Sequence, residues 1–114
     1  MKLYTADRET GTFIDMVSSI EKGYELIRKY ENADKEDGTY EYGFYTVVDE
    51  NHCDVKYTVF WVGGKRDGEV LRYFGDLKKA MDFAWKFWNE HEEEFDPVWG
   101  GVTILDESGN VVEW

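Results

Sequence analysis

The feature that most constrains this chain is an internal repeat with an offset of 57 residues, half of its 114. Residues 44–50 read Phe-Tyr-Thr-Val-Val-Asp-Glu, and residues 101–107 read Gly-Val-Thr-Ile-Leu-Asp-Glu. Carried along the chain without a gap, the offset gives ten identical pairs, which include Lys22 with Lys79, Lys29 with Lys86, Asp49 with Asp106 and Val55 with Val112. We interpret this pattern as a tandem duplication of one supersecondary unit.

The length of the repeat predicts how the two copies are organised. A unit of 57 residues would be marginal alone, whereas hydrophobic residues at 42% and aromatic residues at 18% supply enough material for a joint core. We therefore predict one domain over residues 1–114, made of the repeats 1–57 and 58–114.

Each repeat is predicted to begin with a β-hairpin. In the first copy the strands are 2–6 and 12–17, joined by a polar turn at 7–11. In the second copy the strands 55–62 and 69–74 flank a turn that ends in Asp67-Gly68, a pair that tolerates the positive φ of tight turns.

A helix is predicted after the first hairpin, from Ser18 or Ser19 to Glu31. Ser18 with Glu21 fits a capping box, whereas the repeat register pairs Ser19 with Asp76 and would make these two the N-caps. Both alternatives are compatible with the sequence.

The second helix, capped by Asp76, is predicted to run to about Glu90 or one turn beyond and to stop before Pro97. Its apolar side chains cover an arc of about 200°, about twice the minimum stripe of a surface helix. Such a helix either lies deep in the fold or carries a second contact surface. In the second case a homodimer would form through Trp85 or Trp88.

Each helix is followed by a strand and then by an Asp-Glu turn. The strand 55–62 must end the first copy and open the second, and residues 111–114 end the chain. We therefore predict an α+β fold: a tandem duplication of a ββαβ unit, with a mostly antiparallel sheet of about seven strands, two helices on one face and pseudo-twofold symmetry.

Few residues suggest catalysis or metal binding. His52 and Cys53 are adjacent in a turn, where neighbouring side chains rarely face one ligand, and His91 lacks the second His of a zinc protease helix. A duplicated turn explains the Asp-Glu pairs at 49–50 and 106–107 better than a duplicated acid and base does. We predict no catalytic residue, no metal site and no cofactor, and hence a protein that is not an enzyme.

The formal net charge of −12 bears on the class of partner. Nucleic acid and anionic lipid both attract cations, so direct binding to either is disfavoured and a basic protein partner is favoured. Solubility alone is the alternative explanation of the acidity.

The charge is concentrated in two matched segments, 32–41 and 89–98, which hold −8 of the −12. We predict that both are acidic loops that bind a partner through Asp34, Glu36, Asp37, Glu41, Glu90, Glu92, Glu93, Glu94 and Asp96. Carboxylates near a helix C-terminus oppose the helix dipole, so helix stability does not explain them. Solvated polar loops are the alternative interpretation.

The chain has no apolar run of the roughly 18 residues that a membrane helix needs, and its first residues turn polar too soon for a signal peptide. The single Cys53 fits a reducing compartment. We predict a cytoplasmic protein with no membrane contact.

The stretch 6–15, Ala-Asp-Arg-Glu-Thr-Gly-Thr-Phe-Ile-Asp, together with Tyr30-Glu31 and the segment 44–52, resembles small uncharacterised acidic proteins encoded on phages and other mobile elements of Gram-positive bacteria. The resemblance covers the first half of the chain, and its motifs are structural. It implies a mobile-element accessory protein and no site residues.

These observations lead to one leading hypothesis and two alternatives. The leading hypothesis is a non-enzymatic protein that imitates nucleic acid and occupies a basic surface of a host nucleic-acid enzyme, as anti-CRISPR and anti-restriction proteins do. The first alternative is an immunity protein that neutralises a basic toxin. The second is a structural protein that self-associates through its aromatic helix.

Overall fold

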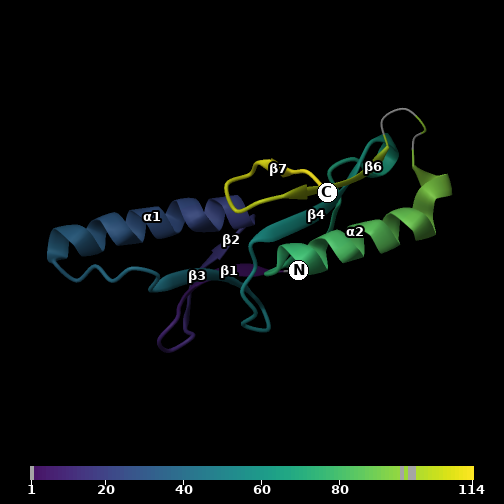
Figure 1. Cartoon of the computed structure of the whole chain (residues 1–114). Coiled ribbons are helices and arrows are strands. Elements are labelled where there is room, and N and C mark those ends of the chain that lie inside the picture. Colours follow the sequence, from purple (N-terminus) through teal and green to yellow (C-terminus); the bar gives the residue numbers. More distant parts are fainter. Residues whose placement is uncertain (1, 96, 98–99) are drawn as a thin grey trace. The chain divides into compact units, whose positions relative to one another are not determined.

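The computed structural model describes residues 2–95, 97 and 100–114, which form two compact units of α+β structure, divided between Val55 and Lys56 (Figure 1). The elements of unit 1 are β1 (Leu3–Asp7), β2 (Phe13–Val17), α1 (Ile20–Asp37) and β3 (Tyr45–Asp49). Those of unit 2 are β4 (Tyr57–Val62), η1 (Gly64–Arg66), β5 (Val70–Phe74), α2 (Leu77–His91), η2 (Glu92–Glu94), β6 (Gly101–Leu105) and β7 (Val111–Val112). Both units therefore contain the order strand, strand, helix, strand.

The seven strands found within the described residues form two sheets, whereas the sequence predicted one. The three-stranded sheet of unit 1 has the order β2-β1-β3, and the four-stranded sheet of unit 2 has the order β5-β4-β6-β7. Every strand pair is antiparallel. The α+β class and the antiparallel pairing are confirmed. The shared face of the helices, the pseudo-twofold relation and the single domain over 1–114 stay predictions.

The stretch 55–62 is not one shared strand, which is why the strands divide between two sheets. Asp54 makes an isolated antiparallel bridge with Val48, and the Val55 N–H donates to the Val47 carbonyl at 3.0 Å. β4 starts only at Tyr57 and pairs with β5 and β6. In unit 2, β7 occupies the place that Asp54 and Val55 take in unit 1, because it pairs with β6 through Val111 and Val112.

The strand ladders correct the ungapped repeat alignment at its first strand. Both hairpins contain a register shift, between Thr5 and Ala6 in unit 1 and between Val59 and Phe60 in unit 2. Ala6 pairs with Phe13, whereas Phe60 pairs with Val70, so the hairpin of unit 2 has three more residues and holds η1. Structurally, Thr5 therefore corresponds to Val59, while the other strands and the helices keep the offset of 57.

Both helices begin at the matched positions that the repeat predicts. Ser19 is the N-cap of α1, and its hydroxyl accepts a hydrogen bond from the Lys22 N–H at 3.1 Å. Asp76 is the N-cap of α2, and its carboxylate accepts from the N–H groups of Lys78 and Lys79. Ser19, rather than Ser18, satisfies the free N–H groups of the first turn.

The Asp-Glu turns are built alike in the two units. Asp49 accepts hydrogen bonds from the N–H groups of Asn51 and Cys53 at 2.8 and 3.0 Å. Asp106 accepts from the matched N–H groups of Ser108 and Asn110, both at 2.9 Å. Each aspartate thus holds its own turn closed, as the interpretation of a duplicated structural turn requires.

The helix of each unit packs on its sheet in a different way. In unit 1 a Cβ added at Gly23 of α1 would lie 2.6 Å from Val47 Cγ2, so only glycine lets the helix come this close to β3. In unit 2 the core between α2 and the sheet contains Val59, Trp61, Ala80, Ala84, Phe95, Val102 and Ile104. The wide apolar arc predicted for the second helix is thus largely used inside unit 2.

Candidate functional site

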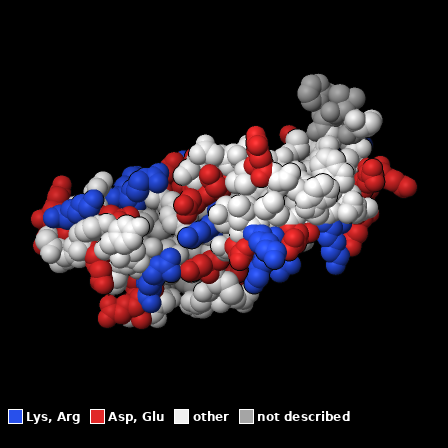
Figure 2. Space-filling model, in the orientation of Figure 1, with Lys and Arg blue, Asp and Glu red and all other residues white. Residues whose placement is uncertain are grey.

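The acidic residues at the end of α2 form one of the two charged segments that the sequence predicts. Glu90 lies in the last turn of α2, and Glu92, Glu93 and Glu94 form the short 3₁₀ helix η2. Figure 2 shows acidic side chains on the surface at this end of the helix. All four side chains are exposed. We call Glu90, Glu92, Glu93 and Glu94 the acidic end of unit 2. The helix predicted to run to about Glu90 or one turn beyond is confirmed, because α2 ends at His91 and η2 follows it directly; only the description of these residues as a loop is wrong.

A buried aromatic ring fixes the acidic end in place. Phe95 follows η2 directly, is 8% exposed, and packs with ring centroids 4.5 Å from Trp61 and 5.0 Å from Trp88. Because Phe95 anchors the chain in the core, the three preceding glutamates are held outside it. The rigid anchor reduces the entropy that an approaching partner would have to remove from these side chains.

The charges of the acidic end are only partly compensated. Glu94 lies 3.8 Å from His91 Nε2. The pKa of Arg66 is raised mainly by its hydrogen bond to Glu69, and the negative charge of Glu94 adds to this effect. Among the described residues, no ion pair within 4.0 Å involves Glu90, Glu92 or Glu93. These three carboxylates are therefore available to an external cation.

A cleft of about 440 Å³ adjoins the acidic end. Trp88, Phe95 and Pro97 contribute apolar surface to it, and Glu92 and Glu93 contribute carboxylates. Aromatic faces beside carboxylates suit the guanidinium group of an arginine, which stacks on rings and forms paired hydrogen bonds with carboxylates. Sequence reasoning missed this cleft, because only the fold brings Phe95 back against Trp88.

The first acidic segment also differs from the prediction. α1 continues to Asp37 instead of ending at Glu31, because only Gly38, in the left-handed region with φ 75°, ends it. The helix therefore contains Asp34, Glu36 and Asp37, and only Glu41 lies in the following loop. Polar residues do not end a helix by themselves, and residues 32–37 contain no glycine or proline.

Asp34 has a structural partner in unit 1. The Tyr45 hydroxyl donates a hydrogen bond to its carboxylate at 2.6 Å, and this bond, followed by burial, raises the pKa of Tyr45 to about 12. Glu36, Asp37 and Glu41 are exposed. Only these three of the first segment resemble the acidic end of unit 2 in their exposure. Asp96, the remaining predicted position, lies outside the described residues.

The two tryptophans proposed for self-association have different environments. Trp85 is 54% exposed and meets Trp114 edge to face, with ring centroids 5.2 Å apart. Trp88 packs against Gly101, where an added Cβ would lie 2.4 Å from its ring, and it also lines the cleft beside Glu92 and Glu93. Of these two residues, Trp85 has the more exposed ring.

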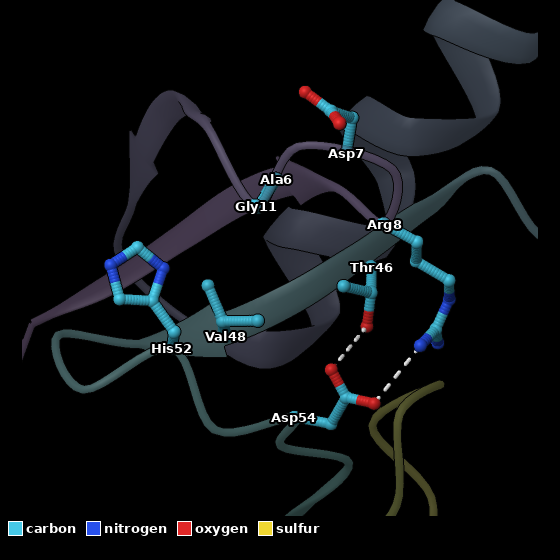
Figure 3. A pocket seen from close by; sticks show the side chains of 8 residues that line it. All are labelled: Ala6, Asp7, Arg8, Gly11, Thr46, Val48, His52 and Asp54. Carbon is cyan, nitrogen blue, oxygen red and sulfur yellow. Dashed lines mark hydrogen bonds and ion pairs between the residues drawn. The ribbon is translucent and has the colours of Figure 1, made fainter.

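A second cleft, of about 160 Å³, lies in unit 1 (Figure 3). Arg8 Nη1 lies 3.0 Å from Asp54 Oδ2, and the Thr46 hydroxyl donates to Asp54 Oδ1 at 3.3 Å. Asp7 accepts hydrogen bonds from the backbone N–H and the hydroxyl of Thr10, which lower its pKa. Both carboxylates are therefore already occupied.

His52 borders this cleft in an unusual backbone conformation. Its φ is 62°, in the left-handed region, and the matched residue of unit 2 is Gly109 with φ 81°. The imidazole stacks on Phe13 at a centroid distance of 4.3 Å, and Phe13 stacks on Tyr4 at 4.2 Å. Ring stacking offsets part of the backbone strain that a non-glycine residue has there. The exposed Cys53 does not belong to this stack.

Neither a metal site nor a membrane span is found within the part of the chain that the structure describes. No group of three His, Cys, Asp or Glu side chains could hold a metal ion there. No helix among the same residues is both long and apolar enough to cross a bilayer.

Comparison with known proteins gives no further constraint, since no family model, no curated protein and no solved structure matches the chain. The resemblance of the N-terminal half to mobile-element proteins stays a prediction.

Proposed function

We propose that this protein is a non-enzymatic binding module that places the acidic end of unit 2 on a basic surface of a nucleic-acid-handling protein in the cytoplasm. The observation that supports this proposal is the exposure of Glu90, Glu92, Glu93 and Glu94 next to the cleft that Trp88 and Phe95 help to line. The anchored carboxylates imitate the closely spaced charges of a nucleic-acid backbone.

The physical basis of the interaction is electrostatic attraction and arginine stacking. A surface that binds phosphates is rich in Arg and Lys, and the field of a chain with net charge −12 attracts it. At contact, Glu92 and Glu93 accept hydrogen bonds from an arginine whose guanidinium lies on the aromatic wall of the cleft. When the acidic end occupies this basic surface, nucleic acid can no longer bind there.

Such competition would inhibit the host enzyme. Anti-restriction and anti-CRISPR proteins, which phages and other mobile elements encode, inhibit host enzymes of this kind. The resemblance noted for the N-terminal half supports this source. The exposed residues Glu36, Asp37 and Glu41 are the additional acidic surface of unit 1 in the same proposal.

The test compares two variants of equal charge. In the first, Glu90, Glu92, Glu93 and Glu94 are replaced by Lys; in the second, the exposed residues Glu9, Glu50, Glu107 and Glu113 are replaced by Lys. Both changes move the net charge from −12 to −4. Each purified variant is used to capture partners from nuclease-treated host lysate.

The wild type and the second variant should retain a basic partner that excess duplex DNA displaces and that elutes as salt rises, because the Debye length falls from about 10 Å at 0.1 M to about 3 Å at 1 M. The first variant should lose this partner. Equal loss in both variants would show that net charge, and not its placement, is responsible, and would contradict the proposal.

The exposure of Trp85 favours one second candidate function, self-association. Sedimentation of the wild type and of Trp85→Glu tests it, because a dimer that depends on this ring becomes a monomer in the variant. Trp88→Glu is less suitable, because Trp88 packs inside unit 2.

A further inference from the structure

The edge strand β2 of unit 1 borders an open groove. β2 pairs only with β1 in the three-stranded sheet that the described residues form, so its other side presents unpaired backbone groups. A groove of about 360 Å³ lies between β2 and α1, with Met16, Val17 and Leu26 as its apolar surface. Met16 is 64% exposed.

Unit 2 fills the matched groove with its own side chains. Phe74 and Phe83 stand at the positions that match Val17 and Leu26, and their ring centroids are 5.3 Å apart. The Arg72 guanidinium lies over both rings, 5.1 and 5.9 Å from their centroids. The open groove of unit 1 therefore lies at the position where unit 2 packs two aromatic rings, and the matched residues that line it, Val17 and Leu26, are apolar as well.

The two lysines that line the groove of unit 1 recur at the matched sequence positions of unit 2. Lys22 and Lys29 flank the groove of unit 1, and their matched residues in unit 2 are Lys79 and Lys86. Lys22 pairs with Glu25 at 3.4 Å, whereas Lys29 has no ion pair within 4.0 Å among the described residues. Although the chain has a net charge of −12, the ammonium group of Lys29 gives the rim of this groove a local positive charge that can bind a carboxylate of a partner.

We propose that unit 1 binds an extended segment of another protein, which adds to the free edge of β2 as a further strand. The segment places an aromatic side chain between Val17 and Leu26 and a carboxylate at Lys29. Backbone hydrogen bonds along an edge strand supply affinity in this mode, and the groove supplies specificity. Met16, soft and exposed, adapts to the incoming ring. Its residues are not those of the acidic end proposed above.

A second copy of this chain is a poorer occupant than a segment of a different protein. Association of two chains that each have a net charge of −12 is opposed by their mutual repulsion. A short segment that carries one ring and one carboxylate is repelled much less by the net charge of the chain.

The test uses the full chain as bait for a phage-displayed library of random dodecapeptides. Enriched peptides should contain an aromatic residue and an acidic residue in a β-prone stretch. Their affinity should fall at least about tenfold with Val17→Phe/Leu26→Phe, which copies the filling of unit 2 and leaves no room for the guest ring.

Two controls separate binding from loss of structure. Lys29→Glu, an exposed change on α1, should weaken binding about threefold or more, while Lys86→Glu at the matched position of unit 2 leaves it unchanged. Replacing the strand-pairing N–H groups of the peptide by N-methyl groups should abolish binding. Absence of enriched peptides, equal binding to the filled variant, or self-association that the filled variant removes would overturn the proposal.

Discussion

Unit 1 and unit 2 share the position of their helix caps, the order of their strands and a turn closed by an aspartate, yet they fill the space between helix and sheet differently. In unit 1 the Tyr30 hydroxyl bonds to Asp15 and lies 3.1 Å from the Thr5 hydroxyl. The matched residues of unit 2 are Phe87, Arg72 and Val59. The three positions that are in contact in unit 1 are polar, whereas their matched positions in unit 2 are mostly apolar.

The difference teaches that one backbone plan accepts two kinds of interior. Unit 2 places rings against one another, with Phe87 edge to face on Trp61 at 5.7 Å, and reaches its stability mainly through buried area. Unit 1 holds the matched Tyr30 by hydrogen bonds to Asp15 and Thr5, and it has Val17 and Leu26 where unit 2 has Phe74 and Phe83. Its β2 side consequently keeps an open groove, whereas unit 2 closes the same place.

The largest expected effect is that of Trp61→Ala in unit 2. Trp61 is 2% exposed and packs on Phe87 and Phe95, so its removal should lower the free energy of unfolding by about 3–5 kcal/mol. Urea unfolding followed by tryptophan fluorescence reports on unit 2 alone, because all five tryptophans follow residue 56. Far-UV circular dichroism reports on both units.

Trp85→Ala is the matched control, since it also removes one tryptophan but an exposed one, and should cost about 1 kcal/mol. The predicted single domain requires the two signals to change together in the wild type. Separate transitions would refute the single domain, and equal losses in the two variants would refute the aromatic core as the main source of stability in unit 2.

A smaller effect is expected from Tyr30→Phe in unit 1, which removes only the hydroxyl that bonds to Asp15 and Thr5. The loss should be about 1–2 kcal/mol, the range for one hydrogen bond to a charged group at a partly exposed site. The midpoint of urea unfolding, followed by circular dichroism, measures it. Tyr42→Phe, at a residue that is 90% exposed, should have no effect.

The reciprocal change, Phe87→Tyr, sharpens the comparison. The new hydroxyl would enter a cluster of Trp61, Phe83 and Phe95, with Arg72 instead of an acceptor at the place of Asp15. This variant should be less stable than the wild type. If neither Tyr30→Phe nor Phe87→Tyr changed the free energy of unfolding, the polar interior of unit 1 and the aromatic interior of unit 2 would be interchangeable, which would contradict the contrast between the units.

The sequence predicted the local structure well where a residue type has one clear effect. The α+β class, the cap at Asp76 and the aspartate turns follow from periodicity and from carboxylates that accept backbone N–H groups. The ladder shift at Val59 was not predictable, because an offset without gaps cannot show three additional hairpin residues. Of the two caps that the sequence left open for α1, the structure has Ser19, the one that the repeat register pairs with Asp76.

The candidate site was predicted in composition and only partly in form. The segment that holds Glu90 to Glu94 was expected to be an acidic loop, although the helix was predicted to run to about Glu90 or one turn beyond; helical hydrogen bonds tolerate charged side chains that point to solvent. The aromatic cleft beside them depends on Phe95, whose burial follows from the fold alone. In unit 1 the sequence contained one indirect indication of the conformation of His52: the matched residue is Gly109, and glycine is typical of positions with positive φ.

The smallest expected effect concerns Tyr45, whose matched residue in unit 2 is Val102. Its hydrogen bond to Asp34, together with burial, raises the pKa of Tyr45 to about 12 in the folded chain, whereas an unfolded tyrosine titrates near 10. Between these values the folded chain holds a proton that the unfolded chain releases. The contribution to stability is therefore complete below pH 10 and is lost as the pH rises through about 12.

Urea midpoints measured at pH values from 9 to 11 should therefore fall more steeply for the wild type than for Tyr45→Phe, which has no phenol to titrate at this position. Asp34→Asn keeps the phenol and should flatten the slope only in part, because burial still raises the pKa of Tyr45. Because Val102 cannot titrate, the difference between the variants belongs to unit 1. Parallel pH profiles for the wild type and Tyr45→Phe would show that the Tyr45–Asp34 hydrogen bond does not distinguish the interior of unit 1 from that of unit 2.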